Sequence, residues 1–104
     1  MITREQAEQL VYERINAPNP QWPDKPEMTI TETQERETGW LVYWTTRQWH
    51  ETRDIRHAIA GNGPYLVCRE DGTLFETGTV PPIEERIRDA ERRLQAHLQR
   101  QTSG

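Results

Sequence analysis

Residues 50–54 read H-E-T-R-D and differ by one residue from the zinc-protease motif H-E-x-x-H. In that motif two histidines four residues apart share one helical face, and both bind the metal. Asp54 could take the place of the second histidine, but the surrounding residues support neither a helix here nor a third ligand. The pattern therefore favours an ordinary surface segment, and we expect neither a metal ion nor a cofactor.

Cys68 is the single cysteine, so the chain cannot form an internal disulfide. It could act as a nucleophile with His50 or His57 if a cation or a helix N-terminus lowered the pKa of its thiol. Alternation along the strand predicted here places Arg69 on the opposite face, where it cannot readily polarise the thiol. We expect Cys68 to be a small buried residue.

The tripeptide Gly61-Asn62-Gly63 is similar to part of a phosphate-binding loop. It lacks the later glycine, the lysine and the Ser or Thr of that motif, and no helix is predicted after it. A turn locked by hydrogen bonds from the Asn62 side chain is favoured. Since the chain also lacks paired carboxylates and a histidine-supported nucleophile, the sequence indicates a protein that is not an enzyme.

Acidic and aromatic residues offer a different kind of site, a surface that recognises another protein. Trp49 is the strongest candidate, because a tryptophan among Arg, Gln and His is poorly explained by core packing, and interfaces enrich this residue. The alternative is ordinary solvation and protection of a sheet edge. The predicted partner-binding residues are Trp49, Glu32, Glu35, Glu37, Glu51, Asp54 and Trp22.

The composition bounds the class of protein. A chain of 104 residues has room for one domain, spanning 1–104. The net charge is -4, and the arginines are interleaved with acidic residues, which argues against nucleic acid as a partner. No apolar run reaches the roughly 20 residues of a membrane span, and the first residues do not read as a secretory signal. We expect a cytoplasmic protein with a protein partner, either a monomer or a weak homodimer.

The elements that must position these residues follow from hydrophobic period and turn chemistry. Thr3 and Gln6 predict a capping box for a helix over residues 3–17. Strands are predicted over residues 28–35, 40–46, 65–69 and 73–77, the last pair joined by an Asp71-Gly72 turn. Residues 47–60 are ambiguous between strand and short helical turns. A final helix begins at Pro81 and Pro82, with fraying from about residue 99. The result is an α+β domain in which two helices pack on a four-stranded antiparallel sheet made of two hairpins.

The second predicted strand is apolar on both faces: one face carries Trp40, Val42 and Trp44, and the other carries Leu41 and Tyr43. Such a strand should be central and covered on both sides. Two helices would cover only one face well, so we expect the sheet to curl, or its second face to meet a loop or a partner. The aromatic core is predicted around Trp40, Trp44, Tyr65 and Phe75, with Trp22 folded onto its edge.

Turn and core residues carry a family resemblance that extends from the first helix to about Glu91. The matching residues are Gly39, Trp40, Gly61, Asn62, Gly63, Pro64, Tyr65, Leu66, Val67, Asp71, Gly72, Gly78, Thr79, Pro82 and Glu84. In this order the chain resembles the YrhB-like family, also called immunity protein 35. The resemblance implies a small bacterial α+β protein that binds a cognate toxin and blocks its active site or substrate path, or a stand-alone accessory protein.

None of the matched positions is catalytic in that reading, and the partner-binding residues lie outside them. The second hypothesis is a chaperone-like accessory module that binds exposed apolar peptide segments. The doubly apolar strand and the proline-rich segment around Trp22 motivate it.

Overall fold

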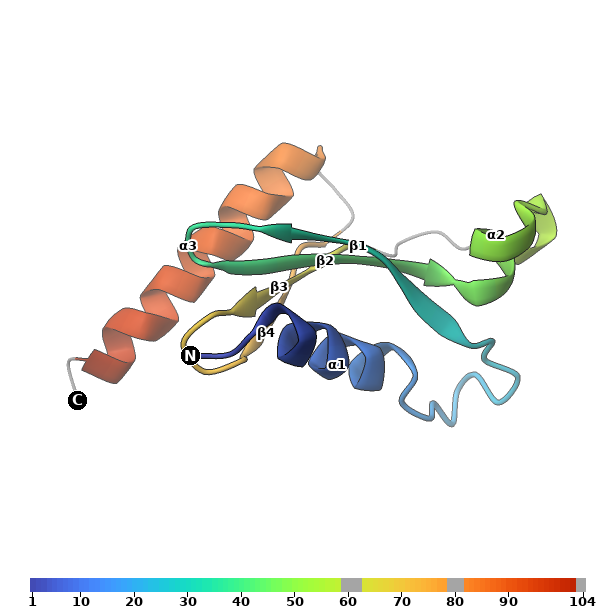
Figure 1. Ribbon diagram of the computed structural model, residues 1–104, viewed down its shortest axis with the longest axis horizontal. Coiled ribbons are helices and arrows are strands. Elements are labelled where there is room, and N and C mark those ends of the chain that lie inside the picture. The colour runs from blue at the N-terminus through green and yellow to red at the C-terminus, as the bar shows by residue number, and fades with distance from the viewer. Residues whose placement is uncertain (59–62, 79–81, 103–104) are drawn as a thin grey trace.

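The computed structural model describes residues 1–58, 63–78 and 82–102. The elements run α1 (Arg4–Ile15), β1 (Met28–Glu35), β2 (Gly39–Thr46), α2 (Arg47–Thr52), the 3₁₀ helix η1 (Ile55–His57), β3 (Tyr65–Cys68), β4 (Leu74–Glu76) and α3 (Ile83–Thr102). The strands form one antiparallel sheet in the order β1-β2-β3-β4 (Figure 1). The predicted α+β class, with a helix before the sheet and a helix after it, is confirmed.

Both termini of α1 follow from side chains next to the helix. At its start, the Gln6 backbone N–H donates to Thr3 Oγ1, and the Thr3 backbone N–H donates to Gln6 Oε1, which is the predicted capping box. At its end, the Asn16 amide bonds both main-chain groups of Met28: it accepts from the N–H at 2.8 Å and donates to the carbonyl at 3.1 Å. Asn16 therefore occupies the outer edge of β1 as a neighbouring strand would.

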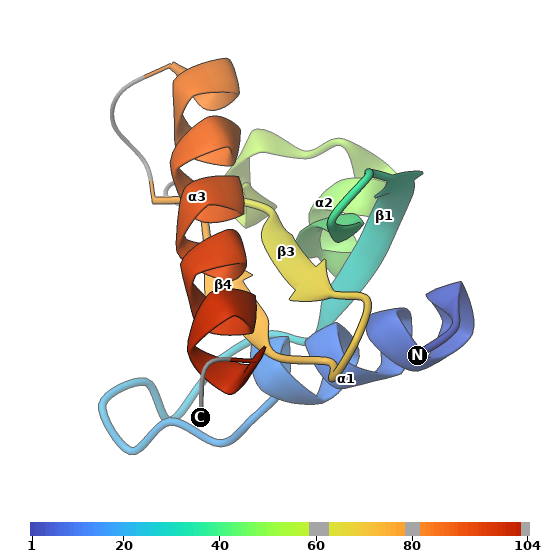
Figure 2. The same cartoon turned by 90° about the vertical axis from the view of Figure 1, so that its left-hand side faces the viewer.

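The two helices cover opposite faces of the sheet (Figures 1 and 2). Ala7, Val11 and Ile15 of α1 pack against Met28, Val42 and Val67 on one face. Ile87, Ala90 and Leu94 of α3 pack against Leu41, Leu66 and Cys68 on the other. The expectation that two helices would cover only one face well is therefore wrong. Since side chains alternate along β2 and β3, each face carries its own apolar row, and each row has its own helix.

The aromatic rings surround these clusters and do not form their centres, which corrects the predicted core. Trp40, Trp44, Tyr65 and Phe75 are only partly buried, whereas Leu41 and the other aliphatic residues of the clusters are fully buried. Position along the strands explains the difference, because the aliphatic side chains lie where both a helix and the neighbouring strands contact them. At the rim the indole N–H of Trp44 reaches a hydrogen-bond acceptor, the Gly63 carbonyl.

The turn that precedes β3 is built around Gly63 and Pro64; Gly61 and Asn62 lie outside the described residues. Trp44 Nε1 donates to the Gly63 carbonyl at 3.0 Å, and Thr77 Oγ1 donates to the Pro64 carbonyl at 2.8 Å. A Cβ on Gly63 would lie 2.5 Å from the Gly78 carbonyl oxygen, so the two segments approach as closely as glycine allows.

The described part of the ambiguous segment after β2 forms the two short helices α2 and η1, so its strand alternative is wrong. Thr46 caps α2 by accepting from the Trp49 backbone N–H at 3.1 Å, and Asp54 caps η1 in the same way through Arg56. At the other end of the chain, Pro82 accepts backbone hydrogen bonds from the first turn of α3, which continues to Thr102. The described residues thus stay helical beyond position 99, where fraying was expected.

Asp71 fastens the β3–β4 turn to α3. Its carboxylate accepts from the Thr73 N–H at 3.0 Å and from Gln101 at 2.9 Å, and it lies 2.7 Å from His97 Nε2. Gly72 follows with a φ of 79°, a conformation that favours glycine. Burial acts to raise the pKa of Asp71, but the hydrogen bonds from His97, Thr73 and Gln101 outweigh it and hold the pKa well below its usual value.

We expect this carboxylate to make the protein acid-sensitive. Because the folded-state pKa of Asp71 is lowered, its stabilisation is present above the unfolded pKa of about 4 and is lost as the pH falls through the folded value. The variant Asp71→Asn should lose about 1 kcal/mol of unfolding free energy at pH 7 and show a weaker dependence on acid below pH 4. Urea denaturation at several pH values measures both, and Glu70→Gln, which removes the adjacent exposed carboxylate, is the control. If the unfolding free energies of Asp71→Asn and of the parent protein change in parallel with pH, Asp71 is not the source of the acid sensitivity.

Candidate partner-binding site

Four of the seven predicted partner-binding residues lie at one end of the molecule, which we call the loop–α2 end. It consists of the loop of residues 16–27 and of residues 47–57, which hold α2 and η1 (right side of Figure 1). It contains Trp22, Trp49, Glu51 and Asp54, and also Ile55, whose exposed fraction of 76% is large for an apolar side chain. Exposed apolar side chains beside charged ones are typical of interaction surfaces.

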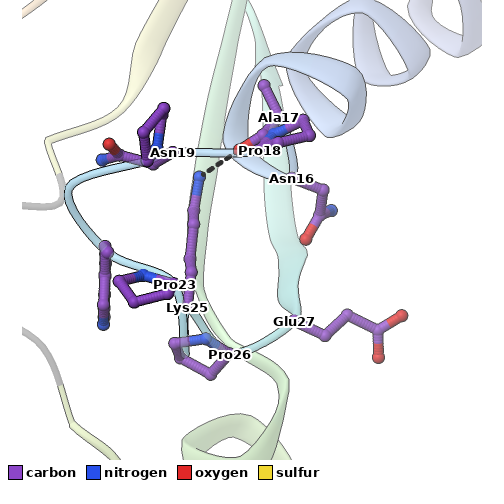
Figure 3. A pocket seen from close by; sticks show the side chains of 10 residues that line it. Asn16, Ala17, Pro18, Asn19, Pro23, Lys25, Pro26 and Glu27 are labelled. Atoms are coloured by element: carbon purple, nitrogen blue, oxygen red, sulfur yellow. Dashed lines mark hydrogen bonds between the residues drawn. The ribbon is translucent and has the colours of Figure 1, made fainter.

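The loop of residues 16–27 folds on itself and not on the core. Backbone hydrogen bonds from Trp22 to Asn19 and from Lys25 to Trp22 make two successive turns, and Lys25 Nζ donates to the Ala17 carbonyl at 3.1 Å. The loop encloses an open hollow of about 520 Å³, and Figure 3 shows Lys25 reaching across it. Trp22 lines this hollow and is 40% exposed, so its predicted position on the edge of the core is wrong. Prolines restrict the loop to this shape and keep Trp22 outward.

Trp49 projects from α2 toward a second hollow, of about 540 Å³, which lies over the sheet and which we call the sheet hollow. Residues of β1, β2 and α2 line it: Thr31, Glu32, Tyr43, Trp44, Thr45, Trp49, His50 and Arg53. The structure therefore brings Glu32 and Trp49 to one site, as predicted. Burial, followed by the charges of Glu32 and Glu84, raises the pKa of Tyr43, so its phenol stays protonated and can donate a hydrogen bond.

Glu35 and Glu37 are not part of this site. Glu35 ends β1 and Glu37 lies in the β1–β2 hairpin turn, at the opposite end of β2 from α2 and separated from it by roughly 20 Å of extended strand. Glu35 also pairs with Arg69 at 3.1 Å. The single acidic surface that the sequence predicted is therefore divided between two ends of the sheet.

Three acidic residues of the loop–α2 end are paired with arginines. Arg47 contacts both Glu27 and Glu51 at 2.7 Å, and Arg56 contacts Asp54 at 2.5 Å. Hydrogen bonding from Arg47 lowers the pKa of Glu27. Hydrogen bonding from Arg56 lowers that of Asp54. These groups are exposed or partly exposed, so the pairs contribute little to stability, but they offset the charge of Glu51 and Asp54, two of the predicted partner-binding residues.

The other candidate chemistries do not assemble. α2 ends at Thr52 and Arg53 turns into the left-handed region, so His50 and Asp54 do not share one helix. Cys68 is fully buried under α3, as predicted, and burial raises the pKa of its thiol. Among residues 1–58, 63–78 and 82–102 no group of three or more His, Cys, Asp or Glu side chains is placed to hold a metal ion. Within the same ranges no helix combines the length and apolarity that crossing a bilayer requires.

Sequence reasoning missed two residues of the site, Arg53 and Ile55. Arg53 was read only as a spacer in the H-E-T-R-D segment, and nothing in the sequence signals its left-handed backbone. Ile55 lies in the segment for which the sequence leaves strand and short helical turns open. Its neighbours Asp54 and Arg56, which form an exposed ion pair, are the signal that could have placed it at the surface.

The fold defines a small α+β protein whose sheet has one helix on each face and whose loop–α2 end is exposed. The sequence model of the Immunity protein 35 family matches residues 7–90, and the chain belongs to that family. The chain is also 34% identical, over 53 residues, to the uncharacterized protein YrhB of Escherichia coli (strain K12). That alignment covers 51% of this chain and 56% of YrhB, so the chain spans about half the length of this relative. No solved structure matches.

Membership of the Immunity protein 35 family confirms the resemblance to the YrhB-like family that the sequence indicated. An immunity-protein family implies a protein partner, and its members are not generally enzymes. The matched range includes both hollows of the loop–α2 end.

Proposed function

We propose that this protein acts in the cytoplasm as an immunity protein, which binds a cognate bacterial toxin and neutralises it by occluding the active site or the substrate path. The observation that carries the proposal is the family match over residues 7–90. The mechanism needs no catalytic group in this chain, because steric exclusion of the substrate suffices.

The loop–α2 end is the surface we assign to the toxin. It offers the exposed Trp22 on the loop, the partly buried Trp49 at the sheet hollow, and the exposed Ile55 of η1. Tryptophans at the centre of an interface supply much of the binding energy, and flanking charges set the orientation. A tight complex would bury on the order of 1,600 Å² in total.

One of the two motivations for the chaperone-like alternative is weakened. The doubly apolar strand β2 packs against the α1 cluster on one face and the α3 cluster on the other, so only its end at the sheet hollow, with Tyr43 and Trp44, is left for a client. The exposed Trp22 in its proline-rich loop remains. A light-scattering assay with two unrelated aggregating clients separates the hypotheses: a chaperone suppresses both at stoichiometric amounts, whereas an immunity protein suppresses neither.

The direct test is co-expression with the product of the neighbouring gene, which the proposal expects to be a toxin. We expect cells that carry both proteins to grow and cells that carry the toxin alone to die. The purified proteins should form a stable complex in size-exclusion chromatography. Unchanged killing in the presence of this protein, together with separate elution of the two proteins, would overturn the proposal.

A further inference from the structure

Arg53 has an unusual backbone for a residue with a side chain. It lies at the C-cap of α2 with φ 59° and ψ 23°, in the left-handed region. Among the residues that the structure describes, Arg53 is the one non-glycine residue with a positive φ. Helices commonly end with a glycine in this conformation, because other residues are disfavoured there. A strained residue on an exposed turn is a reason to look for a role in binding.

Among the described residues, the side chain of Arg53 has an aromatic partner and no acidic one. Its guanidinium lies 5.6 Å from the centre of the Trp49 ring, within the range of a cation–π contact. Arg47 and Arg56, its neighbours at this end, each contact a carboxylate. In the described part of the chain Arg53 makes no ion pair, and Glu32, which lines the same hollow, does not reach it.

The two observations combine into a recognition element. α2 places Trp49 and Arg53 one turn apart, so the ring orients the guanidinium at the rim of the hollow and leaves its N–H groups available. His50 lines the same hollow and can add a further donor. A planar guanidinium fixed on an aromatic ring is well suited to bidentate binding of a carboxylate.

We propose that Arg53, held on Trp49, binds an Asp or Glu carboxylate of the partner protein. The proposal rests on the proposed immunity function. It implies that the toxin carries an acidic residue that enters the sheet hollow. It differs from recognition of a basic partner by the acidic side chains of this end, because Glu27, Glu51 and Asp54 already pair with arginines of the same chain. Phosphate is the other anion that arginine binds, but the net charge of -4 disfavours a nucleic acid.

The variant Arg53→Gly separates binding from folding. Glycine relieves the left-handed backbone, so thermal stability should stay the same or rise. Binding of the cognate toxin should weaken by at least about tenfold, since the toxin's carboxylate loses its partner. The matched control is Arg88→Ala, which removes the same charge from the exposed face of α3, away from the loop–α2 end. Wild-type affinity of Arg53→Gly, measured by calorimetry, would overturn the proposal.

A second measurement is independent of the toxin. In nuclear magnetic resonance, a short poly-glutamate peptide should shift the indole signal of Trp49 in the wild type and not in Arg53→Gly. A poly-lysine peptide of the same length should leave that signal unchanged, as should a short DNA duplex. A shift with lysine or DNA, or none with glutamate, overturns the carboxylate assignment. If the wild type fails to bind the toxin, the immunity function fails, and the peptide titration still decides the role of Arg53.

Discussion

Replacing Gly39 by alanine is expected to reduce the unfolding free energy by at least about 3 kcal/mol, or to prevent folding. Gly39 is the first residue of β2 and is paired with Cys68 of β3. A Cβ at this position would lie 2.0 Å from the carbonyl oxygen of Val67 and 3.0 Å from its carbonyl carbon. Both are backbone atoms of the central sheet, so relief requires β2 and β3 to separate. Urea denaturation followed by circular dichroism measures the loss.

The control for this prediction is Gly78→Ala. Gly78 has a φ of 75°, but nothing lies within 4 Å of an added Cβ. Alanine there meets only backbone strain, for which we expect a loss of about 1 kcal/mol. Similar losses in the two variants would show that close strand approach is not what requires glycine at position 39.

Replacing Trp49 by alanine is expected to weaken toxin binding by about a hundredfold while changing the unfolding free energy by less than about 1 kcal/mol. The first part follows from the place of the ring, which lines the sheet hollow and supports Arg53. The second part follows because α2 has no buried residue and the α2 cap uses only the Trp49 backbone N–H. Calorimetric titration with the toxin and thermal denaturation measure the two quantities.

The matched variant is Trp40→Ala, which removes the same side chain from the wall of the core. Trp40 packs against the α1 cluster, with the Arg69 guanidinium 4.9 Å from the centre of its ring. We expect a loss of about 3 kcal/mol in stability and, at a temperature where the variant is folded, little change in affinity. If Trp49→Ala lost stability but kept its affinity for the toxin, and Trp40→Ala did the opposite, the binding surface would lie away from α2.

The fold was largely predictable because its local signals agree with one another. The Thr3–Gln6 capping box starts α1, alternation sets the faces of β2 and β3, and the Asp71-Gly72 turn joins β3 to β4. What could not be predicted is which face each helix covers. The apolar rows of α1 and α3 are similar, and only the lengths and directions of the connections decide between them.

The site was predictable in its residue types but not in its assembly. Trp49 and Glu32 do line one hollow, but Glu35 and Glu37 lie at the far end of the hairpin. A hairpin whose second strand leads directly into Trp49 must separate its own turn from that residue by the length of the strand. That argument was available from the sequence. The pairing of Arg47 with Glu27 was not, because it depends on how the loop of residues 16–27 returns to the start of β1.

The burial of Cys68 beneath α3 gives the protein an internal reporter of its own local opening. The thiol is fully buried, and it shares its cluster with Ile87, Ala90 and Leu94 of α3 and with no residue of α1. A thiol reagent therefore reacts only in molecules in which α3 has detached, and the labelling rate gives the free energy of that opening. If this free energy is lower than that of global unfolding, the C-terminal helix is released separately. If the two are equal, it is released only with the rest of the fold.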